Sequence, residues 1–268
     1  MARIVVILHH SFDPESDRFA LQLPIRAWQE AGHEVVMVAG TGALPDADLA
    51  ILHVDLSVVP EDYAEAARRY PRVVNASVAD IRKRAISRYL LARDDEWKGL
   101  VIVKSDLNTS GVPELRASFR ARGGEFDART RSSVLPRYRV FRGLEAVPEQ
   151  AWSNPDLVVE KFLPEHDDKG FYLRTWTFLG EHEICRRFAR NKMIIKGADY
   201  LGFELVPVPD LLRAERERLG FDYGKFDFVV RDGQPILLDV NKTPGMPARP
   251  ELCEAYRDLA GGLGSLLW

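Results

Sequence analysis

Short apolar runs alternate with amphipathic segments over the first 78 residues. The run at 3–8 (RIVVIL) is apolar at nearly every position, as expected of a parallel strand buried on both faces. In chain order the pattern predicts strand 3–8, helix 16–31, strands 33–40 and 48–55, helix 60–70 and a last short strand 72–77. Strands alternating with helices indicate a small open α/β sheet. Since no glycine-rich fingerprint follows the first strand, a dinucleotide cofactor is not expected there.

The pattern changes near residue 80. In chain order it predicts a charged helix 78–95, strand 99–106, a basic irregular stretch 121–143, strand 156–165, a hairpin of 171–180 with 183–190, helix 209–220 and a second hairpin within 225–242. This second part is antiparallel β with helices. The predicted fold class is therefore α/β, with α+β character in the second half.

Composition limits the partners of the chain. It has 268 residues, of which 46% are hydrophobic, enough for a sizeable core. The net charge of −3, with acids and bases interspersed, argues against a general nucleic-acid binder. Two cysteines, Cys185 and Cys253, cannot form a disulfide framework, so a reducing cytoplasm is expected. The N-terminal apolar run is too short for a signal peptide, and no run approaches the roughly 18–20 residues of a membrane span.

The second hairpin carries acids on a polar face. Asp239 and Asn241 project from one face of the return strand, and a three-residue turn would set Asp227 directly opposite Asp239. A two-residue turn would put the two acids on different faces. Like charges facing each other are unfavourable, and a divalent cation such as Mg²⁺ would join two carboxylates and an amide oxygen. The alternative is that both aspartates are solvated residues at a strand end.

Basic residues offer the opposite charge. Lys104 ends an apolar strand and precedes a small polar loop, a place where phosphate oxygens can be held. In the first hairpin, a Gly180-Glu181 turn pairs Arg174 with Arg187, and two facing guanidinium groups favour an anion between them. The alternatives are an exposed Lys104, and arginines paired with local acids.

The strand exit "VVEKFLPE" has the groups that an adenine ring requires. Backbone groups around Lys161–Leu163 can bind the edge of the base, and Phe162 and Leu163 offer apolar walls. Acidic residues follow within reach of ribose hydroxyls: Glu165, Asp167 and Asp168. Taken alone, this segment is an ordinary strand exit.

In this order, the pieces resemble the ATP-grasp superfamily. The stretch "FDFVV…LLDVNKTPG" is similar to the metal-binding motif of that family, and "EKFL" is similar to the adenine hinge of D-alanine–D-alanine ligases. The resemblance covers residues 80–250 and implies a small α/β domain at 1–78, followed by an ATP-grasp domain at 79–268. Within the latter, 79–163 would carry the phosphate lid and 164–268 the metal site.

The resemblance also implies roles for individual residues. Lys104 would hold the ATP phosphates, residues Glu160 to Leu163 the adenine, and Asp168 the ribose. Asp227, Asp239 and Asn241 would bind the metal, Mg²⁺ with Mn²⁺ as an alternative. Arg187 and Arg174 would be the catalytic residues. Two positions depart from the family pattern: the loop after Lys104 has a single glycine, Gly111, and Asp239 stands where glutamate is common.

The function that the resemblance implies is an ATP-dependent carboxylate–amine ligase acting through an acyl-phosphate. A small-molecule kinase and a non-catalytic nucleotide-binding protein are the alternatives. The expected substrates are a small carboxylate and an amine, such as an amino acid or a peptide, and a homodimer is compatible with the sequence. His9, His10 and Asp13 follow the first strand, where open α/β sheets bind ligands. Arg190, Lys192 and Lys196 form a basic cluster that could hold a carboxylate or the triphosphate.

Overall fold

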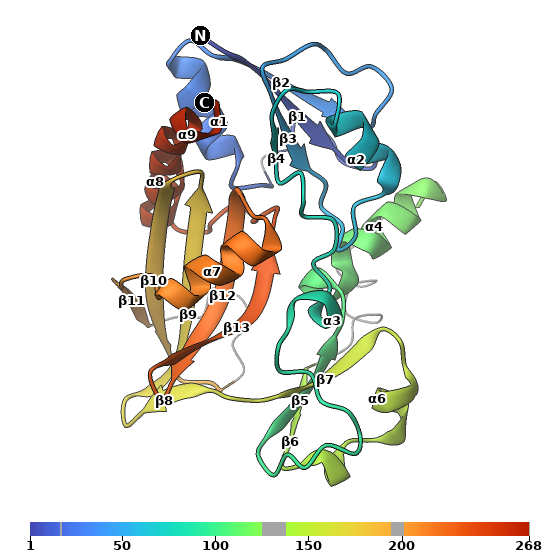
Figure 1. Ribbon diagram of the computed structural model, residues 1–268, viewed down its shortest axis with the longest axis vertical. Coiled ribbons are helices and arrows are strands. Elements are labelled where there is room, and N and C mark those ends of the chain that lie inside the picture. The colour runs from blue at the N-terminus through green and yellow to red at the C-terminus, as the bar shows by residue number, and fades with distance from the viewer. Residues whose placement is uncertain (17, 125–137, 194–200, 268) are drawn as a thin grey trace.

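The computed structural model describes residues 1–16, 18–124, 138–193 and 201–267. Their strands form three sheets, and the long axis of the molecule runs from the N-terminal sheet to the smallest sheet (Figure 1). Lys196 and part of the basic stretch 121–143 lie outside the described residues. The predicted class, α/β with an antiparallel second half, is confirmed. No helix in the described part of the chain is long and apolar enough to cross a membrane.

The N-terminal sheet is parallel, with strand order β2-β1-β3-β4. Its strands are β1 (Arg3–Leu8), β2 (Glu34–Ala39), β3 (Leu49–His53) and β4 (Val73–Val74), and its helices are α1 (Gln22–Glu30) and α2 (Glu61–Ala67). β1 and β3 are buried along almost their whole length, which agrees with their continuous apolar sequences. The carboxyl ends of these strands point toward the rest of the molecule (Figure 1).

The helix predicted over 16–31 begins later than its sequence pattern indicates. α1 starts at Gln22, and Pro24 falls in its first turn, where the missing N–H costs no helical hydrogen bond. The residues before α1 pair instead with a segment far along the chain, since Phe19 forms an antiparallel bridge with Gly245. Pairing with this distant backbone replaces the first turns of the predicted helix.

The smallest sheet is antiparallel, with strand order β6-β5-β7. Its strands are β5 (Val101–Ser105), β6 (Arg139–Phe141) and β7 (Leu157–Lys161). The helices attached to it are η1 (Asn108–Gly111), α4 (Val112–Ala121), η2 (Leu144–Ala146) and α6 (Glu149–Ser153). The sequence pattern assigned no helix to the α4 region, where Pro113 stands in the first turn.

The charged helix predicted over 78–95 is wrong for most of its length. Only α3 (Lys83–Ile86) is helical. The rest of the segment is irregular and makes isolated bridges to other parts of the chain: Asp80 with Val58, and Leu90 with Glu160. These tertiary pairings override the helical propensity of the segment.

The largest sheet follows the strand order β11-β10-β9-β12-β13, with β8 paired to β9. Its strands are β8 (Glu165–Asp167), β9 (Gly170–Leu179), β10 (His182–Arg190), β11 (Gly202–Leu205), β12 (Tyr223–Arg231) and β13 (Gln234–Asn241). Helix α7 (Asp210–Leu219) crosses one face, and its Leu212 packs there against an aromatic core that includes Trp176 and Phe226. The opposite face carries the polar residues of β12 and β13.

The end of the chain returns to the N-terminal sheet. α8 (Pro250–Asp258), η3 (Leu259–Gly262) and α9 (Leu263–Leu267) pack beside α1 (Figure 1). Trp28 of α1 donates its indole N–H to the carbonyl of Ala260 at 2.8 Å. One core cluster therefore joins residues from both ends of the chain.

The second hairpin turns more tightly than predicted. Arg231 pairs with Gln234, so the turn has the two residues Asp232 and Gly233 rather than three. Both have positive φ, at 52° and 76°, as the hairpin turn favoured by Asp-Gly sequences requires.

Asn75 joins the N-terminal sheet to the largest sheet, and its removal provides a test of this junction. Its side chain accepts the N–H groups of Asp222 and Tyr223 at 2.9 and 3.1 Å and donates to the Tyr223 carbonyl at 2.9 Å. Because these bonds are buried and the φ of Asn75 is 62°, we expect Asn75→Ala to lower the free energy of unfolding by about 2–4 kcal/mol.

Chemical denaturation measures this loss. The control is Asn75→Gly, which loses the same hydrogen bonds but adopts positive φ without strain, and should cost about 1 kcal/mol less than the alanine variant. An alanine variant as stable as the wild type would show that the junction does not depend on Asn75.

Candidate active site

The two aspartates of the second hairpin lie opposite each other, as predicted, but not for the predicted reason. The two-residue turn alone would set Asp227 opposite Leu238. A β-bulge corrects the register: Phe228 pairs with Leu237, Asp227 pairs with Asp239, and Leu238 is left without a partner between them. The bulge therefore brings both acids to one face of the sheet.

Each aspartate has a lysine as counter-ion. Lys225 Nζ lies 3.0 Å from Asp227 Oδ2, and Lys83 Nζ lies 3.0 Å from Asp239 Oδ1. Lys83 is fully buried and also donates to the carbonyl of Leu107 at 3.1 Å. The inference that repulsion between the acids requires a metal is therefore corrected, because two ammonium groups already balance the two carboxylates.

The donor atoms that remain fit a hard cation. Asp227 Oδ1 is buried and has no hydrogen-bond partner among the described residues. Burial raises the pKa of Asp227, an effect that the charge of Lys225 opposes. Asn241, two residues after Asp239, shares its face, and its side-chain oxygen accepts the N–H of Thr243 at 2.9 Å. Two carboxylates and one amide form an all-oxygen set suited to Mg²⁺. No group of three or more His, Cys, Asp and Glu residues suited to a metal occurs in the described ranges.

Lys104 lies inside the protein, not at an exposed strand end. Its side chain is 6% exposed, and its Nζ lies 2.8 Å from Glu160 Oε2. The same Nζ donates to the carbonyl of Leu238 at 3.0 Å, the residue that the bulge leaves unpaired. Lys104 thus links the smallest sheet to the acidic hairpin. Glu160, predicted at the adenine, is instead the buried counter-ion of Lys104.

Arg174 and Arg187 face each other across the first hairpin, as predicted. The anion between them belongs to the protein: Glu165 Oε1 lies 2.8 Å from Arg174 and 3.0 Å from Arg187. Arg187 also pairs with Glu204 at 3.0 Å. Both guanidinium groups are therefore neutralised by carboxylates of the chain.

The strand register sets Arg174 and Arg187 apart from the aspartates. Arg174 pairs with Phe228, which lies in the aromatic core under α7, so Arg174 and Arg187 project to that face. Asp227, the neighbour of Phe228 in β12, projects to the other face. The two arginines for which catalytic roles are predicted thus lie on the far side of the sheet from the acids, and this placement does not support those roles.

Two other arginines share the face of the acids. Asp227 pairs with Thr175, and Thr175 pairs with Arg186, so these three project to one side. Arg190, four residues after Arg186, projects the same way, and both arginines are buried. The charge of Arg190 is one of those that oppose the burial-driven rise in the pKa of Asp227.

A pocket opens at the predicted adenine hinge. Its volume is about 440 Å³. The residues that line it are Trp97, Gly99, Leu100, Phe162, Leu163, Pro164, His166, Phe171, Met193 and Arg231. Phe171 of β9 pairs with Arg190 of β10, so this pocket lies at one end of the sheet face that carries Asp227 and Asp239. A flat apolar ring would have walls of the predicted kind here.

Two backbone N–H groups of the predicted adenine hinge already form hydrogen bonds within the protein. The Lys161 N–H donates to Tyr89 and the Phe162 N–H donates to Leu100, at 2.9 and 2.8 Å. These two backbone donors are therefore not available to a base, which corrects the wider prediction for the hinge. Leu163 N–H makes no backbone hydrogen bond with a described residue. Asp168, predicted at the ribose, is exposed in the turn between β8 and β9 and does not line the pocket.

Tyr138 also belongs to this site, and the sequence did not identify it. Burial raises the pKa of its hydroxyl to about 12, and the charge of Asp239 acts in the same direction. Lys104 and a hydrogen bond with Ser110 oppose the rise. The tyrosine therefore lies where the smallest sheet meets the acidic hairpin.

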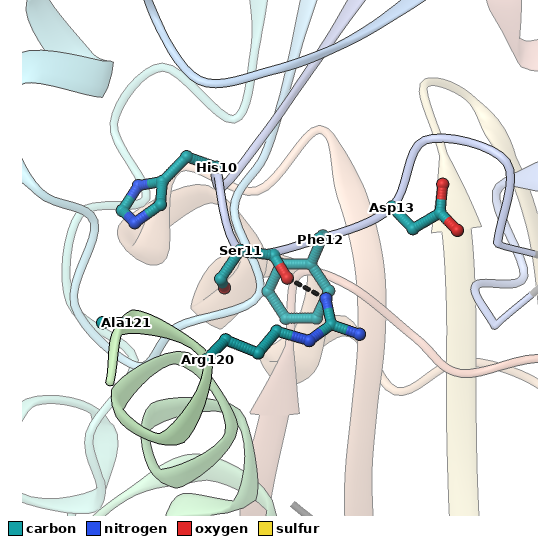
Figure 2. A pocket seen from close by; sticks show the side chains of 6 residues that line it. All are labelled: His10, Ser11, Phe12, Asp13, Arg120 and Ala121. Carbon is teal, nitrogen blue, oxygen red and sulfur yellow. Dashed lines mark hydrogen bonds between the residues drawn. The ribbon is translucent and has the colours of Figure 1, made fainter. Parts of the chain in front are cut away.

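The carboxyl end of β1 is only partly the pocket that the sequence predicts. His9 is buried, shares a hydrogen bond with the Ser11 hydroxyl at 2.8 Å, and has its pKa lowered to about 4, mainly by burial. His10 and Asp13 line a cavity of about 350 Å³ together with Arg120 (Figure 2). His9 is thus a structural residue, and its two predicted companions lie at a cavity.

Comparisons with known proteins decide the fold. No protein-family model matches the sequence, and no curated protein matches it. A RimK domain ATP-grasp protein from Sphaerobacter thermophilus DSM 20745 has a similar structure, with a TM-score of 0.56 and 17% identity over 100% of both chains. The ATP-grasp ligase PsnB, complexed with a minimal precursor, gives a TM-score of 0.54 at 14% identity over 95% of this chain and 98% of the other. The chain has an ATP-grasp fold.

A third solved ATP-grasp structure has the same degree of similarity. The RiPP-associated ATP-grasp ligase from Chryseobacterium gregarium, in complex with ADP and a leader and core peptide, has a TM-score of 0.54 at 10% identity over 97% of both chains. The sequence resemblance is thus confirmed at the level of the fold, which covers the whole chain. The metal and nucleotide residues remain predictions within this ATP-grasp fold.

The residues that the sequence did not identify have a common feature. Tyr138 comes from irregular backbone and Lys83 from α3, a single helical turn, and in neither is there a period long enough to indicate which way a side chain projects. The predicted Gly180-Glu181 turn also sets Arg186 opposite Thr175, but its place on the face of the acids follows from the pairing of Thr175 with Asp227. Lys225 was identifiable, two residues before Asp227 on the same face.

The Lys104–Glu160 pair gives a direct test of the corrected role of Lys104. Because Glu160 is buried, Lys104→Met leaves an uncompensated carboxylate, and we expect it to lower the free energy of unfolding by about 3–5 kcal/mol. The double variant Lys104→Met/Glu160→Gln should recover much of this loss, since neither charge remains. Urea denaturation compares the three proteins. A Lys104→Met variant as stable as the wild type would mean that the buried pair does not form.

Proposed function

We propose that the protein is an ATP- and Mg²⁺-dependent ligase that joins a carboxylate to an amine through an acyl-phosphate. One observation carries the proposal: Asp227 and Asp239 face each other beside Asn241, and a buried carboxylate oxygen of Asp227 has no hydrogen-bond partner among the residues that the structure describes. Lys104 reaches the same hairpin from the smallest sheet. This assembly of hard oxygen donors and cations suits a magnesium nucleotide.

We propose that the nucleotide lies between the smallest and the largest sheets. The adenine would occupy the pocket of Phe162 and Leu163, which supports the base with apolar walls. The phosphates would lie between Lys104 and two buried arginines, Arg186 and Arg190, which project from the same sheet face as Asp227. Fixed cations in a dry site neutralise phosphate charge without reorganisation.

Asp227, Asp239 and Asn241 would hold Mg²⁺, or Mn²⁺ in its place. The bound ion would neutralise charge on the phosphates during phosphoryl transfer. Lys225 and Lys83 hold the two carboxylates at 3.0 Å and keep them in position on the sheet. This arrangement lets the hairpin exist without an ion and still offer one Asp227 oxygen, Oδ1, which no described residue bonds.

The proposed reaction needs no nucleophile from the chain. A substrate carboxylate attacks the γ-phosphorus of ATP, ADP leaves, and an amine then displaces phosphate from the acyl-phosphate. The side chains bind and orient the substrates. Cys185 would be a poor nucleophile, because it is buried and burial raises its pKa to about 12.

We propose a division of the chain at residue 78, with an N-terminal α/β domain before it and the ATP-grasp domain in 79–268. Within the latter, 79–163 holds the smallest sheet and 164–268 the largest. The three separate sheets support this division. The C-terminal helices cross it, because they share a core with α1.

The substrates are proposed by class. Two of the similar structures are complexes, one with a minimal precursor and one with ADP and a leader and core peptide. An amino acid or a peptide is therefore the proposed source of the carboxylate and the amine.

Nucleotide binding gives the first test. We expect ADP with Mg²⁺ to raise the melting temperature, because a ligand that binds only the native state stabilises it. EDTA should remove most of the shift. If the shift persists in EDTA, the acidic hairpin does not bind the nucleotide through a metal.

The reaction itself gives the second test. ADP release from ATP is followed with amino acids and short peptides, offered singly and in pairs. A ligase requires both a carboxylate and an amine for sustained release, whereas a kinase releases ADP with one substrate. Asp239→Asn should abolish release, because a charge leaves the metal set. Release at the wild-type rate by this variant would remove the hairpin from the reaction.

A further inference from the structure

A second polar site lies beyond the metal residues, at the carboxyl end of β1. The cavity of about 350 Å³ is lined by His10, Ser11, Phe12, Asp13, Arg120 and Ala121. Figure 2 shows the Arg120 side chain reaching from the last turn of α4 toward the backbone of Ser11. The cavity therefore lies between the N-terminal sheet and the helix that follows the loop after Lys104.

Arg120 lines this cavity, and Arg18 lies beside it over the ring of Phe12, another lining residue. Within the described ranges, neither guanidinium group has a carboxylate partner. Arg120 donates to the carbonyl of Ser11, a neutral acceptor, and forms no ion pair with a described residue. The Arg18 guanidinium lies over the rings of Phe12 and Phe19, at 5.4 and 5.5 Å from their centroids. It too forms no hydrogen bond or ion pair with the described part of the chain. Both arginines are exposed, so an anion can reach them.

The buried acid that interacts with Arg18, Asp55, is already hydrogen-bonded to another residue. Asp55 accepts a hydrogen bond from the Thr243 hydroxyl at 2.7 Å, and burial raises the pKa of its carboxyl. A single carboxyl group cannot balance both Arg18 and Arg120, so positive charge remains beside it.

The position of Arg18 is fixed relative to the metal residues. Met246 donates its backbone N–H to the Arg18 carbonyl at 2.7 Å, within the loop that follows β13. The same loop is bonded to the metal residues through Thr243. Its hydroxyl donates to Asp55 at 2.7 Å, and its backbone N–H donates to the side chain of Asn241 at 2.9 Å. A group bound at Arg18 would therefore lie close to the proposed site of phosphoryl transfer.

We propose that Arg18 and Arg120 form an anion subsite that binds a side-chain carboxylate of the substrate, so that the protein acts on acidic amino acids or on acidic peptide segments. This inference rests on the proposed function. Planar guanidinium groups suit a carboxylate, and an unpaired cation gains most from a charged acceptor. Asp13 at the rim adds a negative group that suits a substrate ammonium, as an amino acid carries next to its carboxylates.

Calorimetric titration at low salt tests the subsite. The probes are L-glutamate, L-glutamine, and two blocked glycine pentapeptides with a central glutamate or a central glutamine. We expect glutamate, free or in the peptide, to bind about tenfold more tightly than its amide, as loss of one charge-assisted hydrogen bond implies. Arg18→Gln and Arg120→Gln should each remove that preference. Binding of the peptide alone would identify the substrate as a peptide, and binding of free glutamate alone as an amino acid.

Arg122→Gln is the matched control, since Arg122 is exposed at the same end of α4 and bonds to Ser118 within its own helix. It should keep the preference for glutamate. Equal affinity for acid and amide, no binding of either form, or an equal loss in Arg122→Gln would overturn the subsite. ADP with Mg²⁺ is titrated on the same samples. Normal nucleotide binding without glutamate binding removes only this inference, whereas loss of nucleotide binding in the wild type removes the proposed function.

Discussion

The facing pair Asp227 and Asp239 is the constraint on which the site depends. Two carboxylates on one sheet face are tolerated because Lys225 and Lys83 lie 3.0 Å from them. Lys83 comes from α3, outside the sheet, so the pair also ties an otherwise irregular segment to the hairpin. Charge balance at this point thus holds together parts of the chain that share no sheet.

The bulge in the second hairpin connects this constraint to the nucleotide site. The two-residue turn alone would pair Asp227 with Leu238. Because Leu238 is left unpaired in the bulge, Asp227 pairs with Asp239 instead. The Leu238 carbonyl accepts a hydrogen bond from Lys104, whose ammonium is also paired with Glu160. One local irregularity therefore sets the acids opposite each other and joins the smallest sheet to the largest. A bulge beside a site of this kind is common, because it redirects side chains.

Strand periodicity predicted much of this structure, and its limits explain the errors. Alternation correctly gave the apolar and polar faces of the second hairpin and the opposition of Arg174 and Arg187. It did not establish which sheet face those arginines share, because that follows from pairing with a third strand, through Phe228. Lys83 was not identified because it lies in the segment predicted as one long helix. The conformation of that segment is set largely by bridges to distant parts of the chain. Contacts of this kind are not encoded in a local period.

The most direct test of the account is the affinity for Mn²⁺ in the presence of ADP, followed by electron paramagnetic resonance of the free ion. Asp227→Asn and Asp239→Asn should each weaken Mn²⁺ binding by about 10–100-fold, because a charged donor leaves the metal set. Asp210→Asn is the control, since Asp210 is exposed at the start of α7, on the other face of the sheet from the acids. It should bind Mn²⁺ as the wild type does. If both hairpin variants bind Mn²⁺ with wild-type affinity, the facing aspartates do not hold the metal.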